Sequence, residues 1–568
     1  MDVIMFIPNK INVSLFQNSS CIEKYKKIQK IDIYRPVVDN HIDMIPQYIL
    51  SCLFICCAAE GFKILVLYPS PSFSHQRPIM ALTEHLVQKG HELHVVSPNV
   101  VPGLEQNSNY TYVDVSFSYK YFSDEKREDT VTTQEDMSKW EFAEIFKPLA
   151  NIASEQFRSE AFMQFQKRLE SERVSFDVVI VETIFTPYAC PVVRKLTGSA
   201  PIISMSTLSM INSAEESLGS IPHSSFVPSL LSDYTDRMSL WQKIENWISD
   251  RYIYVGFKET MEAAARRFSV ETYGPEFEST VDGCWKKISL SLIASNFLFF
   301  YPRLLGPNVI EVGPLHLKPP KKLPKDLQDW LDGAEKGVIY FSMGSNFKSK
   351  SLSKIGRANL FKFFEELPSG YRVLWKDEAQ NIPKHARNIL TREWFPQESI
   401  LAHPKVRVFI TQGGLQSFQE AVHFGVPMVG IPWYGDQASM VSKMVDAKIG
   451  ARLLPEELES FEKVKSVIGS VLLEESILEN MRRYSAISRD FSSIALEEAT
   501  FWVEHVARHG GAEHLRPSTA DTTLFQYFCL DIIAVIVAFT LAIILVFYYL
   551  CKLLFRVFLG KSAKAKAA

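Results

Sequence analysis

The sequence predicts an α/β protein with two Rossmann-like halves, and three features indicate this class. In the first half, the apolar run Lys63–Pro69 is followed by a polar loop, a helical segment that ends at Gly90 and a strand at His94–Ser97. A second series of this kind begins with the strand Gly337–Phe341. Between the two series, the proline-rich segment Lys318–Lys325 is typical of a linker. Strands that alternate with helices favour parallel sheets covered by helices on both faces.

Further segments extend both series. Phe176–Glu182, FDVVIVE, predicts a buried strand, and a helix and a strand at Pro201–Met205 follow it. In the second half, a predicted helix at Leu352–Glu366 precedes a strand at Arg372–Trp375. These segments strengthen the α/β prediction for both halves.

Length and composition bound the class of protein. The chain has 568 residues, more than one ordinary domain, and its 47% hydrophobic and 22% charged residues are typical of a globular protein. The formal net charge is −3 and no basic stripe appears in the body, so nucleic-acid binding has little support. No Cys/His cluster has metal-ligand spacing, so we expect no metal site. We also expect no cofactor.

The C-terminal region carries a membrane signal. Ile532–Leu550, IIAVIVAFTLAIILVFYYL, contains no charged residue and is long enough to cross a hydrocarbon core of ~30 Å. We expect a transmembrane helix over 528–551 and, by the positive-inside rule, a cytosolic basic tail over 552–568; a buried core helix is the alternative. Lys564 and Lys566 resemble a dilysine retrieval signal of endoplasmic-reticulum membrane proteins, or form a plain basic flank.

The N-terminal region suggests a leader sequence in an unusual position. Ile45–Ala59 has the apolar character of a signal peptide, with small residues before a cleavage point. A polar stretch precedes it, so we expect 1–43 to be an upstream extension and 44–59 to be the signal peptide. The alternative is a second, uncleaved membrane segment, for which the run is short. A cleaved leader implies a single-pass type I protein with a lumenal body.

A lumenal body has consequences for two kinds of side chain. Cys190 and Cys284 would face an oxidising compartment and could pair, although the sequence does not show whether they do. Asn109 begins the triplet Asn-Tyr-Thr, which is an acceptor for N-glycosylation.

The longest motif is Val408–Gln437, VFITQGGLQSFQEAVHFGVPMVGIPWYGDQ. It predicts a strand, a turn at Gly413-Gly414, a helix from Leu415 and a second strand. A glycine pair between strand and helix lets backbone N–H groups approach a phosphate at the positive end of the helix. Asp436 lies beyond the second strand, where it can bond sugar hydroxyls. A nucleotide and a sugar in one crevice indicate a nucleotide-sugar enzyme.

This motif closely resembles the donor-binding motif of the UDP-glycosyltransferases, membrane-bound enzymes that conjugate sugars to small lipophilic molecules. The resemblance runs from about Lys63 to about Tyr549, and Thr-Gln-Gly-Gly, where many relatives have Thr-His-Gly-Gly, is most like the insect members. It implies the GT-B architecture, with an acceptor-binding domain over 60–317, a linker over 318–330 and a UDP-sugar-binding domain over 331–515. The charged and aromatic stretches within 100–280 would then form the acceptor pocket. Relatives often self-associate in the membrane, which makes a homo-oligomer an open expectation.

The resemblance also assigns donor contacts, residue by residue. They are Gly344, Ser345, Trp394, Gln397, Thr411, Gln412, Gly413, Gly414, Gln416, Glu420, Asp436 and Gln437. Trp394 would stack on uracil and Gln397 would hydrogen-bond it, although a core tryptophan is the alternative. Glu420 would accept both ribose hydroxyls, unless it is an exposed helical glutamate. Asp436 and Gln437 would hold the sugar hydroxyls.

Gln412 departs from the histidine of many relatives. Its amide is a neutral donor that cannot become cationic. Stabilisation of the leaving diphosphate would then rely on backbone amides, Thr411, Gln416 and the helix N-terminus.

The resemblance places the catalytic base at His75, in the loop Ser72-Phe73-Ser74-His75 after the first strand. An imidazole suits proton removal from an acceptor hydroxyl, although a loop histidine taken alone is usually structural. Glu182 ends the strand FDVVIVE and would orient the ring, as a carboxylate does in other triads. Better-known relatives have the shorter aspartate there, and a solvated strand-end carboxylate is the alternative.

Together these features predict inverting transfer of a sugar from a UDP-sugar donor to a hydroxyl of a small lipophilic acceptor, for detoxification or metabolite conjugation at the endoplasmic-reticulum membrane. The resemblance of Thr-Gln-Gly-Gly to the insect members favours UDP-glucose as the donor, and no unambiguous cation for a glucuronate carboxylate is found. Two alternatives stay open: a catalytically silent UDP-sugar-binding membrane protein and a lipid or sterol glycosyltransferase.

Overall fold

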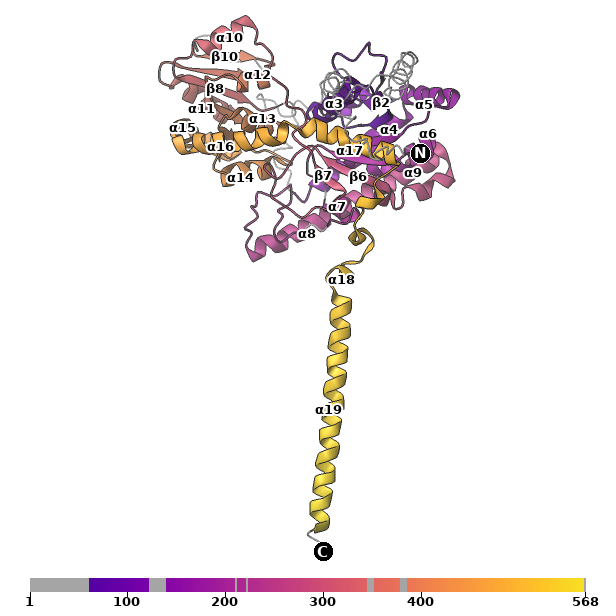
Figure 1. Ribbon diagram of the computed structural model, residues 1–568. Helices are drawn as coiled ribbons and strands as arrows, with labels where there is room; N and C mark the ends of the chain where they lie inside the picture. Colours follow the sequence, from indigo (N-terminus) through magenta and orange to yellow (C-terminus); the bar gives the residue numbers. More distant parts are fainter. Residues whose placement is uncertain are drawn as a thin grey trace, which may run out of the picture. The chain divides into compact units, whose positions relative to one another are not determined.

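Two parallel sheets organise the chain. The computed structural model describes residues 61–121, 139–209, 212–220, 223–344, 352–377 and 386–565, so the predicted extension and signal peptide lie outside the described residues. The first sheet has seven strands in the order β3-β2-β1-β4-β5-β6-β7, and the second has six in the order β10-β9-β8-β11-β12-β13. The predicted α/β class with two Rossmann-like halves is confirmed (Figure 1).

The strands of the first sheet are β1 (Lys63–Leu67), β2 (Glu92–Ser97), β3 (Tyr110–Asp114), β4 (Val178–Glu182), β5 (Ile202–Ser206), β6 (Ile288–Ile293) and β7 (Val309–Glu311). Those of the second sheet are β8 (Gly337–Ser342), β9 (Tyr371–Lys376), β10 (Ile389–Arg392), β11 (Val406–Thr411), β12 (Met428–Gly430) and β13 (Gly450–Arg452).

The helices before the second sheet are α3 (Phe73–Gln88), α4 (Phe146–Arg158), α5 (Glu160–Glu172), α6 (Thr186–Thr197), α7 (Asn212–Ser217), α8 (Leu240–Phe257), α9 (Ala263–Tyr273) and α10 (Lys325–Asp332). The later helices are α11 (Lys354–Glu365), α12 (Gln397–Leu401), α13 (Leu415–Phe424), α14 (Gln437–Asp446), α15 (Phe461–Leu473), α16 (Glu475–Ser492), α17 (Ala495–His509), α18 (Leu524–Tyr527) and α19 (Leu530–Ala565).

Both sheets are buried on their two faces. In β1, Ile64 and Val66 pack with α3 and α17, whereas Leu65 and Leu67 point to the opposite face and pack with α4, α5 and α6. Successive residues of a strand point to opposite sides, so a strand covered on both sides must be apolar throughout. Each such side chain contributes roughly 1.5–3 kcal/mol by leaving water. The continuous apolar runs that predicted these strands therefore have a direct packing cause.

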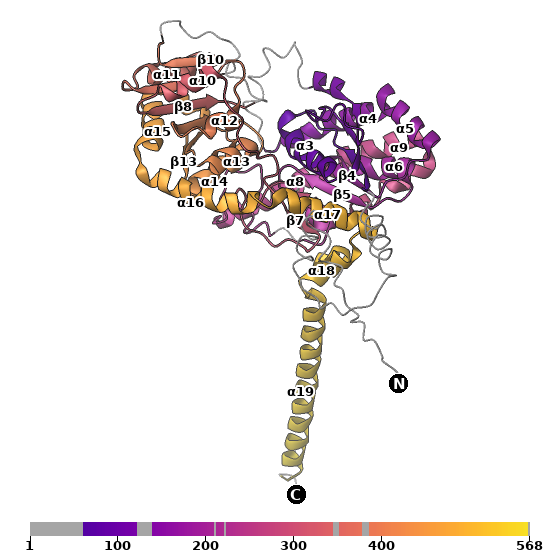
Figure 2. The ribbon, with the colours of Figure 1, turned by 45° about the horizontal axis from the view of Figure 1, so that its top comes forward.

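The chain returns to the first sheet after it has completed the second. Helix α16 packs against α13 of the second half, and α17 packs against α3 of the first. Ala499, Val503 and Val506 of α17 share a buried cluster with Val66 of β1. Figures 1 and 2 both show α17 beside elements of the first sheet. The sequence analysis assigned residues 331–515 to one domain, but the structure packs the part from Ala495 onward against the first sheet.

Two cysteines of the first half are joined. Cys190 of α6 and Cys284 form a disulfide with a Cα–Cα distance of 5.8 Å, across 94 residues of sequence. The sequence had left this pairing open. Among the described residues, Cys529 and Cys551 are unpaired and exposed.

The C-terminal apolar segment forms one long helix. Within the described residues, Leu530–Val557 of α19 is the one helix that is long and apolar enough to cross a membrane, and none of it is buried against the rest of the protein. The predicted span, 528–551, lies almost entirely inside this helix.

We expect the Cys190–Cys284 bond to stabilise the first half, because it closes a long loop in the unfolded chain. The double variant Cys190→Ala/Cys284→Ala should lose about 2–4 kcal/mol of unfolding free energy. Non-reducing thermal melts would measure the loss, and the variant Cys529→Ser, which removes an unpaired thiol, is the control. Equal melting temperatures for the double variant and the control would contradict the expectation.

Candidate functional site

The predicted functional residues lie where the strand order reverses. In the first sheet, β1 pairs with β2 on one side and with β4 on the other. His75 lies in the first turn of α3, directly after β1, and Glu182 is the last residue of β4. In the second sheet, β8 and β11 are neighbours, and Gly344 and Gln412 follow them. Ligands of open α/β sheets bind in the crevice at such reversal points, so the topology brings each predicted group to a site.

His75 and Glu182 face each other. His75 Nδ1 lies 3.7 Å from Glu182 Oε1, which is slightly longer than a hydrogen bond. The His75 side chain is 33% exposed and that of Glu182 only 5%. The second carboxylate oxygen, Oε2, accepts a hydrogen bond from the Ser70 backbone N–H at 3.0 Å. The carboxylate is therefore fixed, while the imidazole stays reachable from solvent.

A buried network holds the backbone of His75. The Thr207 hydroxyl donates to the His75 carbonyl oxygen at 3.1 Å, and the Tyr68 hydroxyl is 2.6 Å from the same threonine oxygen. Burial and the nearby charge of Glu182 raise the pKa of Tyr68, so its phenol stays protonated. The buried Gln76 amide donates to two carbonyl oxygens of the loop after β1, those of Tyr68 and Ser70. These hydrogen bonds hold the backbone of His75 and of the loop before it in place.

Two glycines shape the start of the second site. Gly344 and Gly413 have φ values of +81° and +86°, which side chains rarely adopt. A Cβ on Gly344 would lie 2.5 Å from Gln412 Nε2, and one on Gly413 would lie 2.4 Å from Val441 Cγ2. The Gln412 amide therefore packs directly over Gly344. Ser345, the next predicted contact, lies outside the described residues.

The predicted phosphate turn leads into α13. Thr411 ends β11, and its hydroxyl accepts a hydrogen bond from the Gly413 N–H at 3.4 Å. Gly414 is the residue before α13, and the half-buried Gln416 lies in the first helical turn. Backbone N–H groups in that turn have no partner within the helix, and such groups can bind a phosphate.

Asp436 connects this helix end to the first half. Its carboxylate accepts a hydrogen bond from the Leu415 backbone N–H. Burial raises the pKa of Asp436, and the positive charge of a protonated His75 would oppose that rise. The two groups, one from each half, therefore lie within electrostatic reach of each other.

Gln437 supports the loop before it. Its side-chain carbonyl accepts hydrogen bonds from the backbone N–H groups of Trp433, at 2.8 Å, and Tyr434, at 3.4 Å. The side chain is buried. Its predicted contact with sugar hydroxyls stays a prediction.

Trp394 is available for stacking. It is 60% exposed, whereas the next residue, Phe395, is buried in the core. The Lys376 ammonium lies 5.3 Å from the tryptophan ring centroid, and the ring of Phe73 approaches it edge-on at 6.4 Å. The structure therefore removes the alternative of a core tryptophan.

Glu420 is fully buried and already bonded. Gln397 Nε2 donates to Glu420 Oε2 at 2.7 Å, and the Arg77 guanidinium donates to Glu420 Oε1. The same guanidinium pairs with Glu398 at 2.5 Å. The alternative of an exposed helical glutamate is therefore wrong.

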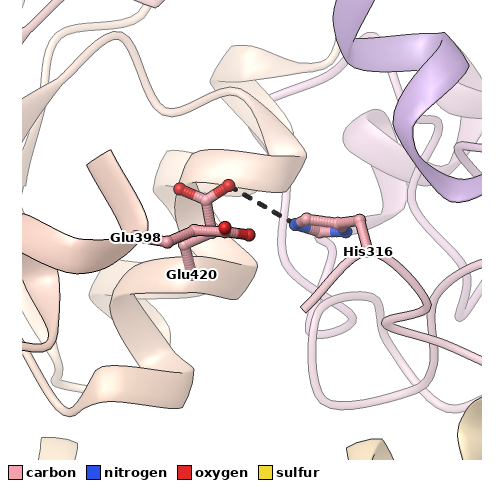
Figure 3. A group of neighbouring side chains, drawn as sticks. All are labelled: His316, Glu398 and Glu420. Atoms are coloured by element: carbon pink, nitrogen blue, oxygen red, sulfur yellow. Dashed lines mark ion pairs between the residues drawn. The ribbon is translucent and has the colours of Figure 1, made fainter. Parts of the chain in front are cut away.

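Arg77 and His316 set the charge of Glu420. Burial alone would raise the pKa of the Glu420 carboxyl, but Arg77 and His316 outweigh it and hold that pKa at about 2. His316 Nε2 lies 3.5 Å from Glu420 Oε1, as the dashed line in Figure 3 marks. Burial and the charge of Arg77 lower the pKa of His316 to about 4, so its ring is neutral at neutral pH.

His316, Glu398 and Glu420 have the geometry of a possible metal-binding group, because their ligand atoms lie within 4.8 Å of one another (Figure 3). The Arg77 guanidinium, however, already supplies positive charge to both carboxylates. A metal ion would have to displace it. The sequence analysis did not find the pair of Arg77 and Glu420, because 343 positions separate the two residues and no local pattern marks them.

The start of α3 meets the second half at three positions. The Phe73 ring contacts Trp394, and the Arg77 guanidinium binds Glu420. The positive charge of a protonated His75 would lower the pKa of Asp436. These three residues of α3 span little more than one helical turn. The predicted base and the predicted donor residues are thus brought to one place.

We expect Arg77 to stabilise the contact between the halves, because its removal leaves the buried Glu420 carboxylate without its main partner. Arg77→Met should cost about 3–5 kcal/mol of unfolding free energy at pH 7. The folded-state pKa of Glu420, about 2, lies below its ordinary value of 4.5, so its stabilising contribution is present above pH 4.5 and is lost as pH falls toward 2. The difference in unfolding free energy between Arg77→Met and the unchanged protein should therefore become smaller as the pH falls.

Urea unfolding at pH 7 and pH 4 would measure this difference. The matched control is Arg237→Met, which removes an exposed arginine that pairs with Asp446 and should change stability little. If Arg77→Met unfolds at the same urea concentration as this control, the stabilising role of Arg77 is wrong.

Comparison with known proteins identifies the family. The family described as "UDP-glucoronosyl and UDP-glucosyl transferase" matches residues 63–565. The chain is 29% identical to UDP-glycosyltransferase UGT5 of Dactylopius coccus, over 92% of this chain and 98% of that protein. It is also 29% identical to UDP-glucuronosyltransferase 2B7 of Homo sapiens, over 90% of this chain and 97% of that protein.

Solved structures agree on the fold. A UDP-glucosyltransferase from Polygonum tinctorium superposes with a TM-score of 0.52 at 16% identity, covering 79% of this chain and 99% of that one. The glycotransferase of kitacinnamycin gives the same TM-score and identity, covering 78% and 99%. Both likenesses confirm the predicted GT-B fold. With two Rossmann-like halves, a family match over most of its length and relatives in insects and mammals, the chain belongs to the UDP-glycosyltransferase family and is an enzyme that transfers sugar from a UDP-sugar to an acceptor.

Proposed function

We propose that this enzyme transfers glucose from UDP-glucose to a hydroxyl of a small lipophilic acceptor, with inversion, to give a β-glycoside and UDP. The observation that carries the proposal is the contact between the start of α3, which holds His75, and the predicted donor residues of the second half. The Phe73 ring meets Trp394, and the Arg77 guanidinium pairs with Glu420. The proposed base for the acceptor therefore lies beside the residues proposed to hold the donor. The acceptor oxygen and the anomeric carbon would meet between them.

His75 would remove the acceptor proton as the oxygen attacks the anomeric carbon. Its exposed ring can meet an acceptor, and the fixed Glu182 carboxylate would stabilise the imidazolium that forms. The 3.7 Å separation is long for a hydrogen bond, but such contacts commonly tighten when substrate is bound. The longer glutamate side chain, in place of the aspartate of better-known relatives, is compatible with this distance.

The donor would lie along the second half. Uracil would stack on the exposed Trp394, and the diphosphate would lie at Gly344, Ser345 and the turn Gly413-Gly414. Thr411, Gln412 and Gln416 would add donors there, and Asp436 and Gln437 would hold the sugar. None of these predicted contacts is cationic, but the Lys376 ammonium donates to the Gly344 carbonyl oxygen at 2.7 Å. It would add positive charge to the backbone and amide dipoles that meet the diphosphate.

Binding of the ribose requires an exchange of partners at Glu420. Its oxygens are taken by Arg77 and Gln397, and His316 lies close by. Glu420 is fully buried, so ribose hydroxyls can reach its carboxylate only if one of the side chains that cover it moves. UDP binding should therefore rearrange the side chains around Glu420, among which Arg77 links the two halves.

Glucose is favoured over glucuronate because a glucuronate carboxylate would need a cation near the sugar. Asp436 and Gln437, the predicted sugar contacts, supply none.

The apolar α19 would anchor the enzyme in the endoplasmic-reticulum membrane as a type I protein with lumenal halves and a glycan on Asn109. A role in detoxification of lipophilic compounds follows from that setting.

Replacement of His75 tests the reaction. His75→Ala should lower kcat by about 100-fold or more, because general-base catalysis is lost, and should leave KM for UDP-glucose nearly unchanged. Glu182→Gln should lower kcat less. Transfer to a mixed panel of phenols, steroids, sterols and sphingolipids would be followed by mass spectrometry, with circular dichroism as the control for folding. Full turnover by folded His75→Ala, or UDP-glucose binding without transfer to any acceptor, would contradict the proposal.

Replacement of Trp394 tests the donor site. Trp394→Ala should raise KM for UDP-glucose about 10-fold, because stacking on a base contributes on the order of 1–3 kcal/mol. Trp394→Phe keeps a flat ring and should recover most of the affinity. Competition between UDP-glucose and UDP-glucuronate in the same assay tests the sugar. A preference for UDP-glucuronate, or an unchanged KM in Trp394→Ala, would refute the corresponding assignment.

A further inference from the structure

Helix α8 exposes an apolar face that the enzyme's chemistry does not explain. Trp241 is 78% exposed, and other large apolar side chains follow it on the same side of the helix. The exposed members on α8 are Leu240, Trp241, Ile244, Trp247, Ile248, Tyr252 and Val255. Their spacing of three or four residues places them on one side of a helix.

The opposite face of α8 already packs on the protein. Asn246, Ser249, Ile253 and Phe257 are buried, and Asn246 donates two hydrogen bonds to backbone carbonyls of the preceding loop. The helix is therefore fixed in place by its inner face. On the outer face, Tyr252 meets the Trp140 ring edge-on at 5.8 Å, and within the described residues the other large apolar side chains are exposed. An outer face of this size is unusual for a surface that meets only water.

The chemistry of the face suits the interface of a bilayer. Two tryptophans and a tyrosine lie among aliphatic side chains, and such amphipathic rings are enriched at the level of lipid headgroups. The charged residues of α8, Lys243, Glu245, Asp250 and Arg251, cancel in sign. Zwitterionic lipid should therefore suffice, and anionic lipid should not be required.

Contacts in the fold place α8 close to the segment that leads into the apolar anchor. The Thr519 hydroxyl, in the 3₁₀ turn Ser518–Asp521, donates to the Gly219 carbonyl oxygen at 2.6 Å, which fixes the chain directly after α7. Glu216 of α7 pairs with Arg251 of α8. Thus α8 packs on the element that holds the chain just before the span.

The connection from that point to the span is short. Residues 522–529 separate the turn from α19, which begins at Leu530. Even fully extended, such a connection spans roughly 30 Å, and α18 shortens it. Leu524, Phe525 and Phe528 in this stretch are also exposed and apolar, as expected for a segment at the membrane surface.

We infer that the outer face of α8 lies in the headgroup region of the bilayer that α19 crosses, and that it fixes the orientation of the catalytic halves to the membrane. The inference rests on the proposed insertion of α19. The occupant of the face is lipid, because the tether keeps α8 near the bilayer whatever other partners are present.

Environment-sensitive labels on the full-length enzyme in phosphatidylcholine nanodiscs test the inference. The cysteines outside the disulfide are first replaced by Ser, and an NBD fluorophore is attached at Trp241→Cys or Trp247→Cys. The replaced residues are Cys21, Cys52, Cys56, Cys57, Cys529 and Cys551. The matched control is Leu473→Cys in α15, because Leu473 is 77% exposed and Trp241 78%. A further variant keeps Cys551, which reports whether the span itself is inserted. Sugar transfer at the unlabelled protein's rate shows that each labelled variant is folded.

The α8 labels should show blue-shifted emission and several-fold stronger quenching by lipids that carry a nitroxide near the headgroup, whereas the label at position 473 should show neither. Water-like emission at both α8 positions, with Cys551 quenched, would overturn the inference while leaving the anchor intact. An unquenched Cys551 would overturn both. Shielding of α8 without lipid quenching, seen only in discs with two copies, would assign the face to a second copy and would also refute the inference.

Discussion

The buried pairing of Arg77 with Glu420 and Glu398 is the interaction on which the arrangement of the two halves depends. A carboxylate with no exposure, such as that of Glu420, is costly unless a cation and hydrogen-bond donors meet it. The guanidinium comes from α3 of the first half and the carboxylates from α12 and α13 of the second. The buried carboxylate of Glu420 therefore holds α3 against α12 and α13, which are far from it in the sequence. Arg77 lies two residues after the proposed base, His75.

The same constraint connects stability with ligand binding. Glu420 is the residue to which the resemblance assigns the ribose, and its partners in the structure are protein groups. The proposed ribose contact and the Arg77 contact between the halves therefore meet at one carboxylate. Ribose that binds there has to share this carboxylate with Arg77. The neighbouring His316 is neutral at neutral pH, so it adds no second positive charge beside Glu420.

Local motifs predicted the turn and the helix start of the donor half, because the groups that form them are close in sequence. Thr411, Gly413 and Asp436 lie within one strand–helix–strand unit, whose turn geometry follows from the glycines themselves. The apolar runs of β1, β4 and β8 predicted buried strands, because sheets covered on both faces require apolar residues at every position. By contrast, β3 and β7 carry weaker patterns, being edge strands with half-exposed residues, and the sequence analysis did not identify them.

The sequence by itself determined the family, the α/β class and the two-half organisation, since each follows from motifs and from the alternation of strands and helices. Through the family resemblance it also predicted His75 and the donor residues. Only the tertiary structure decided which groups meet. It brought Arg77 to Glu420, placed α17 on the first sheet, joined Cys190 to Cys284 and left one face of α8 uncovered. The physical reason is that burial and charge pairing between distant segments depend on how sheets and helices pack. No spacing along the chain records that packing.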